Sequence, residues 1–150
     1  MTRSSTAGRA PEAPAARRVF LDTGIFVAFL DRSDGYHRAA ARLFADPPRR
    51  WWTSAFVVAE TYGWFLHRLG EDAARTFRLA LAELPRLELL TPDTGHLTAV
   101  TGVLERHRGR KLTYVDASSL AFLRQFRIDE VWGTDRDLSI EGARVAPIVR

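Results

Sequence analysis

The fold is decided by one stretch, Arg18-Val19-Phe20-Leu21-Asp22-Thr23-Gly24-Ile25-Phe26-Val27-Ala28-Phe29-Leu30. A short apolar run ends in an acid and is followed by a small pair and a second apolar run, which predicts a buried strand and then a helix beyond Asp22. Ligands of open parallel sheets bind outside the carboxyl ends of the strands, so this acid is placed to hold a cation or to polarise a substrate. Asp is also a good helix N-cap, and Asp22 alone does not decide between these roles.

Length and composition favour one domain with a proper core, because the chain has 150 residues. Its apolar runs are shorter than the roughly 18 residues of a membrane-spanning helix, and its first residues lack a signal-peptide segment. We therefore expect a cytoplasmic protein without a membrane segment. The absence of cysteine excludes disulfides, thiolate nucleophiles and sulfur-ligated metals. Packing or surface roles are expected for the four scattered histidines, His37, His67, His96 and His107.

Positive charge is concentrated at the start of the chain. The net charge is +4, and residues 1–18 hold four arginines against one glutamate. This segment, rich in Ala, Pro, Ser and Arg, is expected to be a disordered basic leader, and residues 19–150 are expected to form the folded domain. Two further basic groups are expected either to contact phosphates or to form a solvated face: Arg49 with Arg50, and Arg106, Arg108 and Arg110 with Lys111.

Strands and helices alternate along the domain. Apolar or aromatic runs predict strands that end at Leu21 and that cover 50–53, 87–90, 130–134 and 145–148. Helical spacing and capping residues predict helices over 24–30, 37–45, 55–69, 71–84, 91–108 with Thr91 as its cap, and through 112–123. This alternation predicts an α/β fold with a mainly parallel sheet of four to five strands, covered by helices and joined by right-handed crossovers.

A second acid interrupts the apolar stripe of the predicted helix 55–69. Glu60 shares a face with Phe56, Val57, Gly63 and Trp64. Burial of a lone carboxylate costs several kcal/mol unless a cation or strong donors meet it. Glu60 is therefore a candidate ligand, or else it lies at the edge of the stripe and reaches outward. Gly63 would let a neighbouring backbone or a ligand come close.

Two more acids occupy comparable positions. Asp116 shares a helical face with Ser119, Leu120 and Leu123, although an acid in a first turn also complements the helix dipole. Asp135 follows the predicted strand 130–134, as Asp22 follows its strand.

A parallel sheet could gather these four carboxylates at one edge. Without a basic partner they would repel and raise one another's pKa, so such a cluster makes physical sense mainly around divalent cations. Oxygen ligands alone select Mg²⁺ or Mn²⁺. Two such ions about 4 Å apart would activate a water and stabilise the leaving oxygen in phosphodiester hydrolysis. The chain's candidate metal ligands are Asp22, Glu60, Asp116 and Asp135.

Five pieces of the sequence resemble PIN-domain ribonucleases, particularly the VapC-type toxins of bacterial toxin–antitoxin pairs. The resemblance extends over roughly residues 19–148. Its pieces are Asp22-Thr23, Asp34-Gly35-Tyr36-His37-Arg38-Ala39-Ala40, Thr53-Ser54 leading to Glu60, Leu112-Thr113-Tyr114-Val115-Asp116-Ala117, and Thr134-Asp135-Arg136-Asp137. It implies a PIN-like three-layer sandwich, and a metal-dependent endoribonuclease that hydrolyses RNA, dimerises and is silenced by a cognate antitoxin.

The resemblance also assigns roles to residues. It implies that the catalytic residues Asp22, Glu60, Asp116 and Asp135 bind Mg²⁺ or Mn²⁺, with hydroxyl support from Thr23, Thr113 and Thr134. Asp137 is a further candidate ligand or water-orienting residue, or simply a turn residue. Gly24 departs from the family, in which a small polar residue is common, and this puts a supporting hydrogen bond in doubt. The basic leader, residues 1–18, is a second departure from the family pattern.

Three other interpretations were weighed against this one. Asp22-Thr23-Gly24 spells the aspartic-protease triplet, but the helical spacing argues against a mostly β enzyme. A phosphatase that resembles the haloacid dehalogenases would have a second Asp at position 24, where this chain has Gly24. The serious alternative is a catalytically inactive PIN-like module that binds RNA or protein. Trp51 and Trp52 would then, as in the toxin, be either packing residues or part of a dimer or antitoxin surface.

Overall fold

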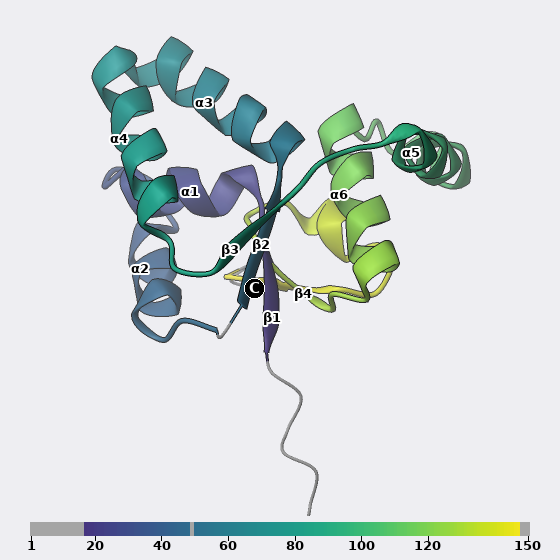
Figure 1. Ribbon diagram of the computed structural model, residues 1–150. Helices are drawn as coiled ribbons and strands as arrows, with labels where there is room; N and C mark the ends of the chain where they lie inside the picture. Colours follow the sequence, from purple (N-terminus) through teal and green to yellow (C-terminus); the bar gives the residue numbers. More distant parts are fainter. Residues whose placement is uncertain (1–16, 49, 148–150) are drawn as a thin grey trace, which may run out of the picture.

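A computed structural model describes residues 17–48 and 50–147 (Figure 1). Its centre is a five-stranded sheet of order β3-β2-β1-β4-β5 in which every adjacent pair is parallel. The strands are β1 (Arg18–Leu21), β2 (Arg50–Ser54), β3 (Leu87–Leu90), β4 (Glu130–Trp132) and β5 (Arg144–Ala146). The expected parallel sheet is confirmed.

Helices cover both faces of the sheet and make three layers (Figure 1). One face carries α1 (Thr23–Leu30), α2 (His37–Ala45), α3 (Ala55–Leu69) and α4 (Glu71–Glu83). The other carries α5 (Thr94–Arg106) and α6 (Tyr114–Phe126), and a short 3₁₀ helix, η1 (Arg136–Ser139), joins β4 to β5. This is the expected α/β sandwich.

The strand order reverses direction at β1. The chain moves outward from β1 through β2 to β3, and then returns to the other side of β1 as β4. The carboxyl ends of β1 and β4 lie side by side, because the Asp22 backbone N–H donates to the Trp132 carbonyl at 2.9 Å. Such a switch point leaves a crevice outside the strand ends, which is where open α/β sheets bind ligands.

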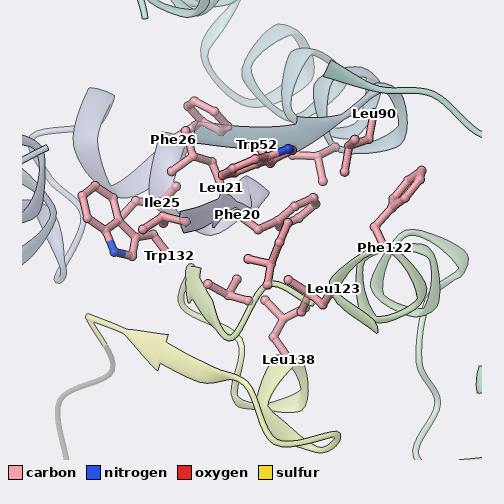
Figure 2. Packing of buried hydrophobic residues seen from close by; sticks show 14 of the residues in the cluster. Phe20, Leu21, Ile25, Phe26, Trp52, Leu90, Phe122, Leu123, Trp132 and Leu138 are labelled. Atoms are coloured by element: carbon pink, nitrogen blue, oxygen red, sulfur yellow. The ribbon is translucent and has the colours of Figure 1, made fainter. Parts of the chain in front are cut away.

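Two apolar layers hold the sheet between the helices (Figure 2). Side chains alternate along β1, so Phe20 lies on the side of Phe122 and Leu123, whereas Leu21 lies on the side of Ile25 and Phe26. All of these side chains are buried. Because β1 is buried on both faces, it reads as a continuous apolar run.

The two adjacent tryptophans of β2 are packing residues. Trp51 and Trp52 are 3% and 4% exposed. The Trp51 ring lies 5.2 Å from Trp132 and 5.6 Å from Phe44 of α2. The Arg18 guanidinium lies 6.0 Å from the Trp52 ring. In this protomer neither tryptophan contributes to an exposed surface.

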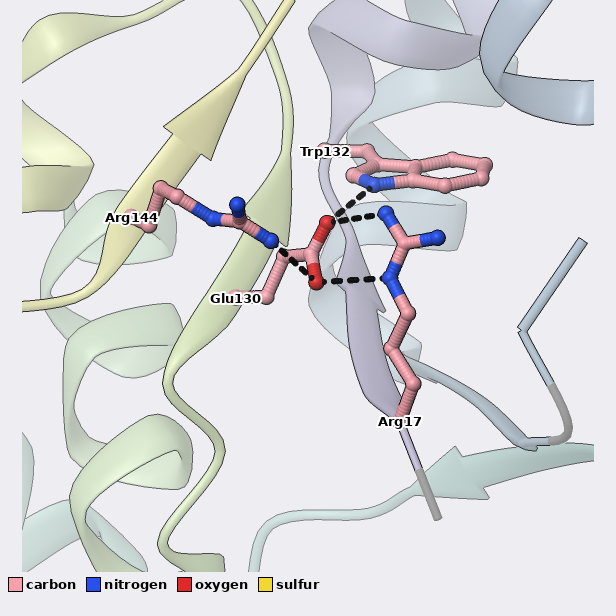
Figure 3. A network of polar contacts seen from close by, with 4 residues as sticks. All are labelled: Arg17, Glu130, Trp132 and Arg144. Atoms are coloured by element: carbon pink, nitrogen blue, oxygen red, sulfur yellow. Dashed lines mark hydrogen bonds and ion pairs between the residues drawn. The ribbon is translucent and has the colours of Figure 1, made fainter. Parts of the chain in front are cut away.

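A charged network closes the opposite, amino-terminal edge of the sheet (Figure 3). Buried Glu130 accepts hydrogen bonds from Arg17 at 2.6 and 2.9 Å and from the Trp132 indole at 3.0 Å, and it pairs with Arg144 at 2.9 Å. Burial alone would disfavour the charged carboxylate, but these donors lower the pKa of Glu130 to about 2. Arg17 and Arg18 thus belong to the folded unit. The rest of the expected leader lies outside the described residues.

A few predicted boundaries differ from the structure. Asp93, not Thr91, caps α5: its carboxylate accepts from the His96 backbone N–H at 2.7 Å, and the helix begins only at Thr94. β4 ends at Trp132 because η1 follows closely. β5 covers Arg144–Ala146, and the end of the predicted strand lies outside the described residues. No helix among the described residues is long and apolar enough to span a bilayer.

Candidate metal centre

Asp22 lies in the crevice at the switch point and is only 5% exposed. Gly133 makes room for it, because a Cβ at that position would lie 3.2 Å from the Asp22 Cβ. Burial, followed by the negative charges of Glu60, Asp116 and Asp135, raises the pKa of Asp22 to about 7, against the effect of the Thr23 backbone hydrogen bond. Within residues 17–48 and 50–147 no ion pair joins Asp22 to a basic side chain.

Glu60 reaches this centre from α3 through a chain of hydroxyls. Thr61 donates to the Thr23 hydroxyl at 3.0 Å, and Thr23 donates to the Glu60 carboxylate at 2.7 Å. The expectation that Glu60 is buried in an apolar stripe is wrong. The buried face of α3 is Val57, Thr61 and Phe65, which places Glu60 at its solvent-exposed edge.

Asp116 is fixed by the first turn of α6. The Thr113 hydroxyl accepts from the Asp116 backbone N–H at 3.1 Å, and the Asp116 carboxylate accepts from the Thr113 backbone N–H at 3.0 Å. This capping box accounts for the helix-terminus role of Asp116. Burial, aided by Asp135 and Asp137, raises the pKa of Asp116, while the bonds with Thr113 oppose that shift. The half-buried carboxylate therefore serves the helix and faces the other acids.

Asp135 and Asp137 lie on the turn after β4. Asp135 caps η1 by accepting from the Asp137 backbone N–H at 2.9 Å. Asp137 forms an ion pair with Arg110 at 3.5 Å. This pair and its place in the turn explain Asp137 without a metal.

Thr134 lies directly against Gly24 of α1. A Cβ on Gly24 would collide with the Thr134 hydroxyl and would lie 2.9 Å from the Thr134 backbone nitrogen. Glycine is the residue that fits here. A small polar residue at position 24, as the family pattern would have, does not fit this geometry.

The four predicted acids thus approach one another at one sheet edge, but they do not form a closed cage. Among the described residues, no three His, Asp or Glu side chains stand close enough to hold a metal ion. The other three acids are engaged in hydrogen bonds instead: Glu60 with Thr23, Asp116 with Thr113, and Asp135 within its own turn. Their assignment as ligands stays a prediction.

Sequence reasoning missed several residues that shape the site. Thr61 supports Thr23 from within α3, and the Thr53 hydroxyl donates to the Leu21 carbonyl at 2.8 Å. Ser54 caps α3, because its hydroxyl accepts from the Val57 backbone N–H at 3.1 Å. The available signal was the polar Thr61, which lies between Val57 and Phe65 on the buried face of α3.

This arrangement, a parallel α/β sandwich with acids at the switch point, places the acids where open α/β sheets bind their ligands. The PIN domain family profile matches residues 19–140, and the chain belongs to this family. The 23S rRNA-specific endonuclease VapC20 of Mycobacterium tuberculosis is 32% identical over 125 residues, which cover 83% of this chain and 94% of the relative.

Solved structures agree with the fold. The crystal structure of M. tuberculosis VapC20, described as a sarcin–ricin-loop-cleaving toxin, superposes with a TM-score of 0.77 at 28% identity, over 84% of this chain and 96% of that one. A toxin–antitoxin complex from Klebsiella pneumoniae (TM-score 0.61, 17% identity) and FitAcB from Neisseria gonorrhoeae (0.62, 20%) each cover 85% of this chain and 95% of theirs. These two show the shared fold alone.

Proposed function

We propose that this protein is a metal-dependent endoribonuclease and the toxin of a toxin–antitoxin pair. One observation carries the proposal: Asp22 is buried at the switch point of the sheet, and the negative charges of Glu60, Asp116 and Asp135 help to raise its pKa. Like charges gathered at a buried position repel one another and destabilise the fold unless a bound cation compensates them.

The donor set fits Mg²⁺ or Mn²⁺. Its candidate ligands are all carboxylates, which suit hard cations. Asp22, Glu60, Asp116 and Asp135 would hold the metal, exchanging their local hydrogen bonds for coordination. A bound divalent ion supplies charge stabilisation and an activated water for phosphodiester hydrolysis.

The chain itself positions these ligands. Thr23 and Thr61 hold Glu60 beside the crevice, and the capping box holds Asp116 at the start of α6. The buried position of Asp22 keeps bulk water from one side of the site. Thr134 contributes packing against Gly24.

The substrate we propose is structured RNA. VapC20 is named for cleavage of 23S rRNA, and the similarity to it covers most of both chains. A sarcin–ricin-loop hairpin RNA is therefore the first substrate to test. A cognate antitoxin, a homodimeric state and a cytoplasmic location complete the proposal. The similarity to VapC20, which is described as a toxin, supports the antitoxin as a partner.

Cleavage of this hairpin with Mn²⁺ or Mg²⁺ tests the proposal directly. We expect Asp116→Asn to lower the rate of RNA cleavage about 100-fold or more, while the variant still folds. Cells that express this variant should no longer show growth inhibition. Asp129→Asn, an exposed acid just before β4 at the opposite edge, is the matched control and should cut like the parent. Equal cleavage by Asp116→Asn and the parent would refute the metal assignment.

The inactive-module alternative makes a different prediction. A binding-only module should show no metal-dependent gain in thermal stability. We expect added Mn²⁺ to raise the melting temperature of the parent and to leave that of Asp22→Asn unchanged.

A further inference from the structure

Two aromatic rings bridge the starts of α3 and α6 beside the acids. Phe56 and Tyr114 meet edge to face, with ring centroids 5.7 Å apart. Tyr114 is 43% exposed, although it is a large aromatic side chain. The contact supports one side of the Tyr114 ring and leaves much of the remainder to solvent.

This pair lies close in sequence to two of the proposed metal ligands. Phe56 is one helical turn before Glu60 on the same face of α3. Tyr114 stands two residues before Asp116, in the turn that the capping box fixes. The backbone of Tyr114 is therefore as well fixed as that of Asp116.

The loop that leads into Tyr114 is strongly basic. Arg108, Arg110 and Lys111 are all exposed between α5 and α6. Lys111 adopts a left-handed backbone with φ of 56°, which is costly for a residue with a long side chain. Arg110 reaches Asp137 at 3.5 Å, so this loop lies at the same edge as the acids.

We propose that Tyr114, backed by Phe56, is a stacking platform for an unpaired base of the RNA next to the scissile phosphate. The inference rests on the proposed ribonuclease function and names the part of the substrate that the site reads. An aromatic face accepts any base once that base is free of its own stack, whereas a duplex keeps its bases covered. The basic loop would contact the flanking phosphates. The geometry thus selects loops or single strands over duplex RNA.

A packing role alone explains less of the geometry. A ring that served only to join α3 and α6 would gain most by burial, but Tyr114 remains widely exposed beside a basic loop. Phe126, at the far end of the same helix, is 37% exposed and packs on Phe122 with centroids 6.3 Å apart. It has a comparable ring and exposure without the neighbouring acids, and so provides a matched control.

The test measures RNA binding in EDTA, where the proposed enzyme does not cleave. The probe is a sarcin–ricin-loop hairpin with 2-aminopurine replacing each loop adenine in turn. We expect binding to quench the fluorophore at one position, and Tyr114→Ala to remove that quench and weaken binding about 5- to 100-fold. Tyr114→Phe should bind like the parent, and Phe126→Ala should change binding less than about two-fold.

Two further RNAs isolate the stacking contact. An abasic loop nucleotide at the quenched position should weaken parent binding and leave Tyr114→Ala unaffected, and the fully paired duplex should bind both proteins equally. Equal effects of Tyr114→Ala and Phe126→Ala, no measurable hairpin binding, or no quench at any position would overturn the platform. Failure of the parent to cleave with Mn²⁺ would instead refute the proposed function, and the binding comparison would still be readable.

Discussion

At the scale of single residues, the crevice combines a buried acid with tight backbone packing. Asp22 has like charges around it, and Gly133 and Gly24 leave space that a methyl group would fill. Each of these features costs stability or restricts the sequence. Each can be tested by one substitution.

Asp22→Asn should stabilise the metal-free protein at high pH. Because the folded protein raises the pKa of Asp22 to about 7 from 3.8, the stability associated with this group is present below about pH 3.8 and is lost as the pH rises through 7. Each pKa unit corresponds to about 1.4 kcal/mol, which sets an upper limit of about 4 kcal/mol. In urea unfolding with EDTA at pH 8, the free energy of unfolding of Asp22→Asn should therefore exceed that of the parent. This difference in free energy should vanish near pH 4. A less stable variant at pH 8 would show that the carboxylate is favourably held without metal.

Gly24→Ala and Gly63→Ala should have opposite effects. Both glycines lie inside helices, but a Cβ on Gly24 would collide with Thr134, whereas one on Gly63 would have no described atom within 4 Å. Among the described residues, no neighbouring backbone makes the close approach expected at Gly63. We expect Gly24→Ala to cost about 1–3 kcal/mol from overpacking, and Gly63→Ala to gain about 0.5–1 kcal/mol from helix propensity. Chemical unfolding checks both, and a neutral Gly24→Ala would contradict the packing described here.

At the scale of helices and strands, the site depends on where each element begins. α3 and α6 both start at the edge where β1 and β4 end, so Glu60 in the second turn of α3 and Asp116 in the first turn of α6 lie at this edge. Capping residues fix these starting points, which links helix stability to the geometry of the acids.

Thr113→Ala should lower both stability and activity. Loss of the α6 cap costs about 1 kcal/mol and frees Asp116 from the capping box. Asp93→Ala removes the cap of α5, a helix that carries no proposed ligand, and should cost a similar free energy of unfolding. We expect cleavage per folded molecule to fall in Thr113→Ala, to stay unchanged in Asp93→Ala and to be retained in Thr113→Ser. Equal activity of the two alanine variants would assign Thr113 a structural role alone.

At the scale of the whole molecule, sequence patterns predicted which elements exist and how they follow one another. The apolar run before Asp22 and the periodicity around Glu60 are local signals, and they located β1 and α3 correctly. The strand order and the exposure of Glu60 depend on contacts between distant segments. Thr61 and Thr23 are 38 residues apart in the sequence, and Gly24 and Thr134 are further apart. A local sequence pattern could therefore predict neither contact.

The edge of the sheet opposite the acids makes the whole fold sensitive to acid. Glu130 ties the segment before β1 to β4 and β5, through Arg17 and Arg144 (Figure 3). Because its pKa is lowered to about 2 from 4.5 in the folded protein, its contribution is present above about pH 4.5 and is lost as the pH falls through 2. Glu130→Gln keeps the shape but removes the charge that both arginines and the Trp132 indole use.

We expect Glu130→Gln to lower the free energy of unfolding by about 1–3 kcal/mol at pH 7, because hydrogen bonds to a buried charge are lost. The difference in free energy of unfolding between parent and variant should shrink as the pH approaches 2. In urea unfolding, the stability of the variant should therefore fall less steeply with decreasing pH than that of the parent. Glu88→Gln is the control, since Glu88 forms an exposed pair with Arg50 at 4.0 Å, and it should change stability by less than about 0.5 kcal/mol. RNA cleavage by the folded Glu130→Gln variant should match the parent, because the amino ends of the strands are remote from the crevice. A loss of cleavage in that variant would mean that the two edges of the sheet are coupled.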